Sequence, residues 1–212
     1  MPSMLRRTVF SLLLVLPFLA PAPPAGAAAP ADAGAFIGQL ANQALQILAR
    51  KNLGEADREA AFDKLLTVNF DIPRIARFVL GRYWTSASDA DKRKFIDTYR
   101  EFVIRSYAAR FSTYGGETVK VTRARAESPD VSIVDSDIIH PNGEPPIKLS
   151  WRVHKDANRY QVVDVDVEGV SMMVTQKEEF ASVIQRNGGT VAGLIQAIQQ
   201  KLQSGDLTLG GG

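Results

Sequence analysis

The chain has 212 residues, with 25 Lys and Arg against 23 Asp and Glu, 45% hydrophobic residues and no cysteine. The lack of cysteine excludes disulfide bonds, thiol catalysis and thiolate metal sites. The length suits one domain, or one domain with a helical lobe, and allows a hydrophobic core without covalent cross-links.

The first 29 residues have the composition of a secretory signal peptide. Arg6 and Arg7 precede the apolar stretch TVFSLLLVLPFLA (8–20), and small residues follow up to Ala29. This stretch is too short for a typical membrane-spanning helix, and such a pattern is typical of a cleaved leader. We therefore expect residues 1–29 to be removed and the remaining chain to be exported.

Charge is unevenly distributed along the remaining chain. Residues 50–125 carry 16 Lys and Arg against 10 Asp and Glu, whereas residues 126–170 carry 4 against 9. The simplest interpretation is solvated helix faces, and the alternative is a surface that meets charged partners or lipid head groups. An exported protein is not expected to bind nucleic acid.

The first half of the chain has helical spacing. One helix is predicted to begin near Asp32, and a second to cover residues 55–69. Asp71 is predicted to cap a third helix, in which proline follows in the first turn and Gly81 ends the helix. Three helices are therefore expected before the first aromatic-rich segment.

A fourth helix is predicted to begin at Ser88 and to end at Tyr114-Gly115-Gly116. Its aromatic residues are spaced so that they share one side of the helix. Such a row either fills a core or forms the wall of a cavity, and the residue pattern alone favours a core. The row consists of Phe95, Tyr99, Phe102, Tyr107, Phe111 and Tyr114.

The pattern then changes to a period of two residues, which predicts four antiparallel strands with one polar and one apolar face. The strands are expected over residues 118–125, 131–139, 147–153 and 160–168. Asp164 and Asp166 are expected to face water. The apolar face is predicted to carry Val119, Val121, Val131, Ile133, Ile147, Leu149, Trp151, Val163, Val165 and Val167.

Two further helices are predicted after the strands, the first ended by Gly188-Gly189 and the second begun by Thr190. The predicted fold class is therefore α+β, with a helical lobe packed on a four-stranded antiparallel sheet. We expect a folded domain over residues 30–204 and a flexible tail over residues 205–212.

No pattern in the chain indicates catalysis. His140 and His154 are expected at the surface, because their spacing does not suit a metal site. Asp164 and Asp166 lie two apart on a strand and are expected to form surface salt bridges. We therefore expect no catalytic residue, no metal and no cofactor.

Three segments resemble the MlaC or toluene-tolerance family of periplasmic lipid-binding proteins. They are FDIPRIARFVLGRYW (70–84), KFIDTYREFVIRSYAARFSTYGGETVKV (94–121) and VVDVDVEGVSMMVTQKEEFASVIQRNGG (162–189). The similarity extends over residues 36–202, and its most specific pieces are LGRYW (80–84) and DVDVEGVS (164–171).

The resemblance implies a periplasmic, non-enzymatic carrier that holds phospholipid acyl chains in an apolar cavity between helices and sheet. It implies as partners an inner-membrane MCE-type ABC transporter complex and an outer-membrane lipoprotein–porin complex. A helix movement hinged at Gly81, Gly115 and Gly116 is expected to admit the lipid. The expected lipid-binding residues are Phe78, Val79, Trp84, Phe95, Tyr99, Phe102, Val103, Tyr107, Phe111, Val121, Ile133, Leu149, Trp151, Val165, Val167 and Met172.

Three alternatives stay open. A branch of the family, the HpnM-like proteins, accompanies hopanoid biosynthesis, and membership of this branch would make the cargo a hopanoid. An enzyme with an isomerase-type pocket would need a reactive group such as Tyr99 or Tyr107 in the cavity. A structural adaptor would have a filled core and no ligand.

Overall fold

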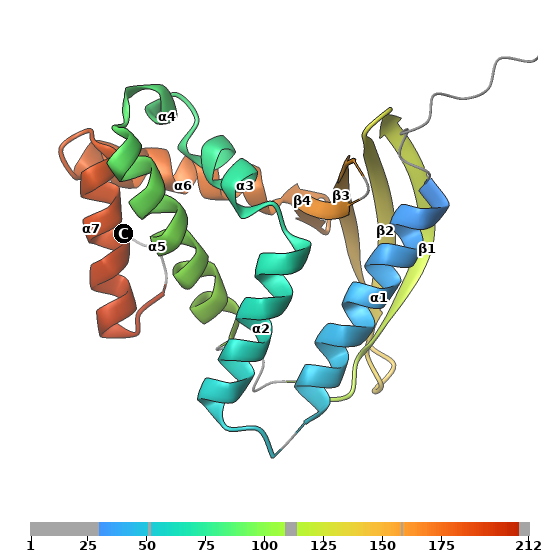
Figure 1. Ribbon diagram of the computed structural model, residues 1–212. Helices are drawn as coiled ribbons and strands as arrows, with labels where there is room; N and C mark the ends of the chain where they lie inside the picture. Colours follow the sequence, from blue (N-terminus) through green and yellow to red (C-terminus); the bar gives the residue numbers. More distant parts are fainter. Residues whose placement is uncertain (1–29, 51, 109–113, 158, 208–212) are drawn as a thin grey trace, which may run out of the picture.

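The computed structural model describes residues 30–50, 52–108, 114–157 and 159–207, so the expected signal peptide lies outside the described residues. This part of the chain forms seven helices and one five-stranded antiparallel sheet, which confirms the α+β prediction (Figure 1). The helices are α1 (Pro30–Ala49), α2 (Glu55–Asn69), α3 (Ile72–Leu80), α4 (Tyr83–Ser86), α5 (Asp89–Ala108), α6 (Met172–Arg186) and α7 (Val191–Ser204). The strands are β1 (Thr118–Ser128), β2 (Val131–Ile139), β3 (Ile147–Asp156), β4 (Arg159–Val167) and β5 (Val170–Ser171).

The sheet is a meander in which each strand pairs with the next one along the chain. The sequence predicted four strands, and the fifth is the two-residue β5. Glu168 and Gly169 have φ angles of 51° and 84°, which is the backbone of a two-residue hairpin turn. This turn folds Val170 back against Val167 and adds the short edge strand.

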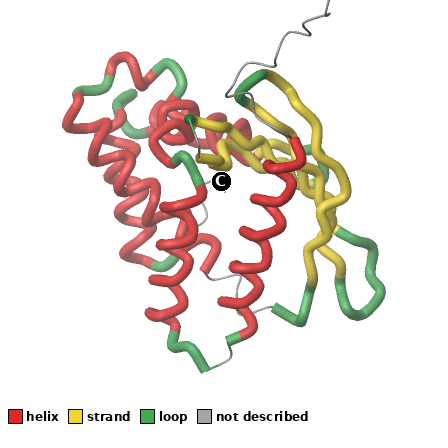
Figure 2. The backbone as a smooth tube through the Cα atoms, turned by 45° about the vertical axis from the view of Figure 1, so that its right-hand side comes forward, coloured by secondary structure: helices red, strands yellow, loops and turns green. Residues whose placement is uncertain are grey.

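The face of the sheet on which α1 lies is called the inner face here. The inner face carries Val121 and Ala124 of β1, Val134 of β2, and Trp151 of β3, all of which pack in one apolar cluster with α1. Figure 1 shows α1 along β1 and β2, and Figure 2 shows the same layers turned by 45°. The inner face is therefore covered mainly over its β1–β2 half.

Small residues allow α1 to approach β1 closely. A Cβ atom added to Gly34 would lie 3.5 Å from the Cβ of Ala124, and one added to Gly38 would lie 3.9 Å from Val121. Both distances are ordinary van der Waals contacts, so the helix backbone lies one methyl group away from the β1 side chains.

The predicted alternation in β2 is wrong by one residue. Ser132, Val134 and Ser136 pair with inner-face residues of β1 and β3, so Ile133 lies on the opposite, outer face. In the register Ile133 is flanked by Arg125 and Arg152. A period of two shows which residues of a strand share a face, but it does not show which of the two faces is covered. The sequence therefore could not place the two serines inside and the isoleucine outside.

The outer face carries ion pairs. Arg125 contacts Asp135 at 2.6 Å, and Arg152 contacts Glu127 at 2.8 Å. His154 is buried on this face, with its Nε2 atom 3.3 Å from Asp130, so the expectation of a surface histidine is wrong there. Among the described residues no group of histidine and carboxylate side chains could hold a metal ion.

The helical lobe has its own core, formed by α3, α5, α6 and α7. The rings of Phe95 and Tyr99 stack with centroids 5.6 Å apart, and Phe180 meets both edge-on at 5.7 Å. Phe95 and Phe180 are fully buried. Within the described residues, none of the helices combines the length and hydropathy of a membrane-spanning helix.

Burial of Tyr99 has a consequence for stability at alkaline pH. Burial raises the pKa of Tyr99 well above its ordinary value of about 10. The folded state therefore keeps a proton that the unfolded chain loses, and stability falls as the pH rises above about 10. We expect urea unfolding between pH 9 and pH 11.5 to show this loss, and Tyr99→Phe to reduce its slope.

Tyr83→Phe is the matched control for Tyr99. The hydrogen bond from Arg82 to the Tyr83 hydroxyl lowers the pKa of Tyr83, so its removal cannot reduce an alkaline loss of stability. An unchanged pH slope in Tyr99→Phe would contradict the assignment of the loss to the buried phenol.

A buried carboxylate joins the sheet to the helical lobe. Asp164, with its side chain 2% exposed, accepts hydrogen bonds from Ser171 Oγ at 2.7 Å, Met173 N at 3.2 Å and Val165 N at 2.8 Å. Ser171 in turn caps α6 by accepting from Val174 N at 3.0 Å. The expectation that Asp164 faces water is wrong, because this carboxylate accepts from the Met173 N–H group in the first turn of α6, which has no partner within the helix.

A second joint lies at the start of α3. Phe70 forms a parallel bridge with Val162, and Asp71 N donates to Val162 O at 3.0 Å. The buried Gln161 side chain donates to Phe70 O at 3.2 Å. Asp71 also caps α3 as predicted, by accepting from Arg74 N at 3.1 Å.

Candidate functional site

The β3–β4 half of the inner face is apolar and only partly covered. Leu149 pairs with Val167 and Trp151 pairs with Val165, so the four side chains share one face. All four are partly exposed, although Val134, Val153 and Val162 beside them are fully buried. We call Leu149, Trp151, Val165 and Val167 the apolar strip.

The indole ring of Trp151 is held in place on this strip. Its Nε1–H donates a hydrogen bond to Ser136 Oγ at 2.9 Å, across the neighbouring strand. Ser136 is itself buried, so this bond satisfies a polar pair inside an apolar region. The serine on the inner face of β2 thereby orients the largest side chain of the apolar strip.

A hollow of about 370 Å³ lies between α1, α2 and the start of β4. It is called the α1–α2–β4 hollow here. Its lining is partly aromatic, because the rings of Phe36 and Tyr160 stack with centroids 6.0 Å apart. Both rings also pack against the inner-face cluster, so the hollow adjoins the apolar interior.

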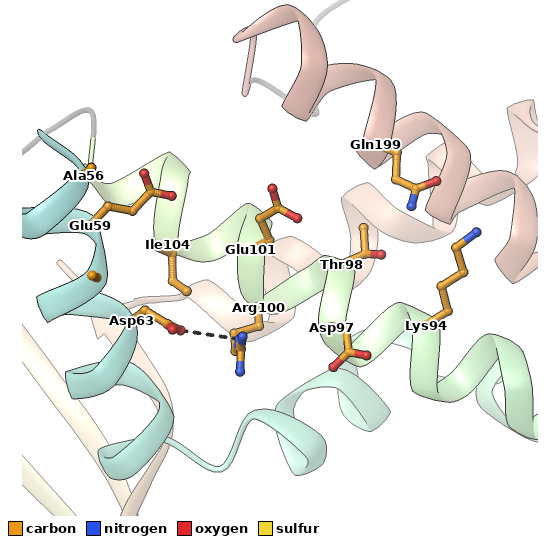
Figure 3. A pocket seen from close by; sticks show the side chains of 11 residues that line it. Ala56, Glu59, Asp63, Lys94, Asp97, Thr98, Arg100, Glu101, Ile104 and Gln199 are labelled. Carbon is orange, nitrogen blue, oxygen red and sulfur yellow. Dashed lines mark ion pairs between the residues drawn. The ribbon is translucent and has the colours of Figure 1, made fainter.

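A larger hollow of about 640 Å³ lies between α2, α5 and α7. Figure 3 shows charged side chains along it, with Asp63 and Arg100 joined at 3.4 Å. Glu59, Lys94 and Glu101 also line it. A lining of charged groups does not suit acyl chains, so this hollow is not the expected lipid cavity.

The structure divides the predicted lipid-binding residues of the helices into two groups. The first group is buried in the core of the helical lobe, where aromatic rings pack against one another, and it lines neither of the two hollows. The expected cavity wall is thus a core over this part of α5. This group contains Val79, Phe95, Tyr99 and Phe102, and Trp84 and Val103 pack against it.

The second helical group lies nearer the surface. Phe78 is 38% exposed, with the Lys177 ammonium 5.0 Å from its ring, and Tyr107 is 44% exposed. Met172 is partly exposed at the first residue of α6. Phe111 lies outside the described residues.

Most of the predicted lipid-binding residues of the sheet share one face. Val121, Leu149, Trp151, Val165 and Val167 are on the inner face, and only Ile133 is on the outer face. The structure therefore brings together the predicted residues of β1, β3 and β4 but not those of α5.

Comparison with known proteins identifies the family. The family model described as MlaC protein matches residues 38–200. The chain belongs to the MlaC family. This confirms the resemblance seen in the sequence.

Two relatives of this MlaC-family chain are informative. It is 28% identical over 126 residues to the intermembrane phospholipid transport system binding protein MlaC of Haemophilus influenzae. That match spans 58% of this chain and 58% of the relative. The structure also superimposes on a phospholipid-binding protein of Ralstonia solanacearum in complex with a phospholipid, with a TM-score of 0.73 and 26% identity over 81% of this chain and 97% of that chain.

The expected hinge glycines lie in connections between elements of this MlaC-family structure. Gly81, at φ 51°, ends α3 and leads to α4, and it stays a predicted hinge. Gly115 and Gly116 lie between α5 and β1, and Gly116 has φ 104°. These two glycines lie between the lobe and the sheet and stay a predicted hinge.

Sequence reasoning missed the residues of the α1–α2–β4 hollow. Phe36 lies in the helix predicted to begin near Asp32, and no sequence pattern marks Val68 or Arg159 as part of a site. Tyr160 was counted only as a strand residue. The alternation of residues in β4 could have placed Tyr160 on the inner face, because it lies two residues before Val162 on the same face of the strand.

Proposed function

We propose that this chain is a non-enzymatic carrier of phospholipid, with acyl chains against the apolar strip of the inner face. The observation that carries this proposal is an apolar strip left partly uncovered on the inner face. Its support comes from membership of the MlaC family and from the phospholipid held by the similar Ralstonia solanacearum protein.

Physical chemistry explains why such a carrier needs an apolar surface. Exposing an acyl chain to water costs about 0.8 kcal/mol per methylene, or on the order of 20 kcal/mol for two chains. A surface of valine, leucine and tryptophan offers tails an environment similar to the bilayer without requiring hydrogen bonds. The lipid then has a similar free energy in the carrier and in the membrane. Both loading and release are therefore possible.

We place this carrier in the periplasm after removal of residues 1–29. Its proposed partners are an inner-membrane MCE-type ABC transporter complex and an outer-membrane lipoprotein–porin complex, between which it shuttles lipid. The name of the Haemophilus influenzae relative, which refers to intermembrane phospholipid transport, supports this role.

The enzyme alternative has little support at its named residues. Burial raises the pKa of Tyr99, which makes its phenol a weaker acid, and its ring is packed between Phe95 and Phe180. Tyr107 lies 44% exposed near the end of α5 and lines neither described hollow. We therefore propose binding without chemistry.

The proposal is tested by identifying what co-purifies with the protein. The protein is purified without detergent, examined by native mass spectrometry, and its organic extract is analysed. A stoichiometric phospholipid is the expected result. A hopanoid would replace phospholipid as the cargo, and an empty protein that also takes up no added lipid would favour the adaptor.

A further inference from the structure

We propose that the joint surface of α3 and α6 docks this protein on an anionic membrane surface. The joint surface, called the α3–α6 patch here, combines exposed apolar side chains with exposed basic ones. It consists of Arg74, Arg77, Phe78, Arg82, Val174 and Lys177. The proposal goes beyond the proposed function, because it concerns how the protein meets a bilayer and not what it holds.

Two large apolar side chains are exposed in the patch. Phe78 on α3 is 38% exposed, and Val174 in the first turn of α6 is 44% exposed. Lys177 lies one turn after Val174, and its Nζ atom is 5.0 Å from the centre of the Phe78 ring. α3 and α6 pack against each other, as Figure 1 shows, so the two apolar side chains belong to one surface.

The side chain of Lys177 bridges the two helices. A Cβ atom added to Gly81 would lie 2.9 Å from Lys177 Cε, so the aliphatic stem of the lysine lies against the end of α3. The residue as a whole stays exposed. A lysine whose stem covers apolar surface while its ammonium group reaches water is typical of a membrane interface.

The same surface is basic. Residues 72–88 contain three arginines and no acidic residue, and all three arginines are exposed. Asp71, which directly precedes this segment, pairs with Arg74 at 3.0 Å. Lys177 adds a further positive charge from α6. The patch therefore keeps three positive charges when the pair of Asp71 and Arg74 is left out.

Acidic residues of α6 offset only part of this charge. Glu178 is exposed one turn after Val174 and belongs to the same surface. Glu179 lies two residues after Lys177, which places it on another side of the helix, and it accepts a hydrogen bond from Gln176 at 3.0 Å. A surface with net positive charge and exposed apolar side chains fits an anionic bilayer, which offers negative head groups and hydrocarbon together.

The patch adjoins the end of the apolar strip. Val170 pairs with Val167 across the β4–β5 turn, so it shares the inner face with the strip. Val170 is 53% exposed and directly precedes Ser171, the cap of α6, whose first turn carries Val174. This step rests on the proposed function: acyl chains on the apolar strip end beside the surface that meets the bilayer.

Flotation with lipid vesicles tests the proposal. The purified protein is mixed with vesicles of phosphatidylcholine alone, or with vesicles that also contain about 30% phosphatidylglycerol. We expect the protein to float only with the anionic vesicles. Raising NaCl from about 0.15 M to about 0.5 M is expected to release most of it, because salt screens the attraction between exposed charges.

Three changes within the patch have expected effects of opposite sign. Arg77→Gln combined with Lys177→Gln should lower the partition coefficient about tenfold or more, since each lost positive charge weakens binding about fivefold. Val174→Asp should lower it as well, and it keeps the fold because an acidic residue in a first turn favours the helix. Glu178→Gln should raise it by up to about fivefold.

The sheet provides matched controls. Lys120→Gln combined with Arg123→Gln removes two exposed positive charges from β1, and Ile139→Asp adds an acid at another exposed apolar residue. Both proteins are expected to float as the wild type does. If they lose binding as much as the patch variants do, the α3–α6 patch is not the docking surface.

Two further results would overturn the proposal. Patch variants that float as well as the wild type would exclude this surface. A wild type that does not float with anionic vesicles would exclude the membrane and favour an acidic protein as the partner of the patch. Neither result affects the proposed function, which is read from the phospholipid that native mass spectrometry finds in the same proteins.

Discussion

Replacement of Asp164 by alanine is expected to destabilise the protein by about 3 kcal/mol or more. The change removes the acceptor for Ser171 Oγ, Met173 N and Val165 N, and leaves Arg152 without a carboxylate 3.7 Å from it. Loss of one partner from a buried charged network costs about 3–5 kcal/mol. Urea unfolding at neutral pH, followed by circular dichroism, measures the effect.

Asp166→Asn is the control for this prediction. Burial, together with the nearby negative charge of Asp164, raises the pKa of Asp166, so the folded state disfavours its charged form. Neutralising Asp166 should leave stability unchanged or slightly higher, whereas Asp164→Asn should lower it. Equal effects at the two positions would show that Asp164 does not join sheet and lobe.

Leu149→Asp is expected to reduce the bound lipid by tenfold or more while the protein stays folded. A carboxylate in the apolar strip must be desolvated by an acyl chain, which strongly disfavours binding. Leu149 is partly exposed and belongs to neither apolar cluster, so its replacement harms the core little. Lipid occupancy is measured by native mass spectrometry, and folding by thermal unfolding.

The matched control for Leu149 is Ile139→Asp. Ile139 is 40% exposed, and it follows the inner-face position 138, so its side chain lies on the outer face. It should keep the wild-type lipid content. If both variants lose lipid equally, the inner face is not the binding surface, and a general loss of solubility or folding would account for the result.

The sequence predicted most of the framework because caps and turns are local. Asp71, Ser88 and Thr190 each accept a hydrogen bond from the N–H group three residues later, as expected. Gly81 ends α3 as expected. These interactions involve neighbours in sequence, so a residue pattern is enough to find them.

It was harder to predict which residues lie on the inner and outer faces of the sheet, because this depends on how each strand pairs with its neighbours. β4 contains an extra residue between Val162 and Val165, and β1 contains irregularities of its own, so strict alternation fails there. Asp164 was expected in water because it alternates with valines. Its burial depends on α6, whose start meets this position only in the folded chain.

The site was predictable only in part for a related reason. Aromatic spacing showed that one side of α5 is apolar but not what lies opposite it, and Phe180 from α6 fills that position. The α1–α2–β4 hollow combines two consecutive helices with β4, which follows them only after three further helices and three strands. No single stretch contains enough of it to be recognised.

The close approach of Gly34 to Ala124 sets how far α1 stands from the sheet. A methyl group at this glycine would make an ordinary van der Waals contact with Ala124, and a longer side chain would need a larger spacing between α1 and β1. One substitution at Gly34 would therefore change the separation of α1 from β1 while every other residue of the inner face stayed the same. The distance between helix and sheet is thus adjustable at a residue that lines neither hollow.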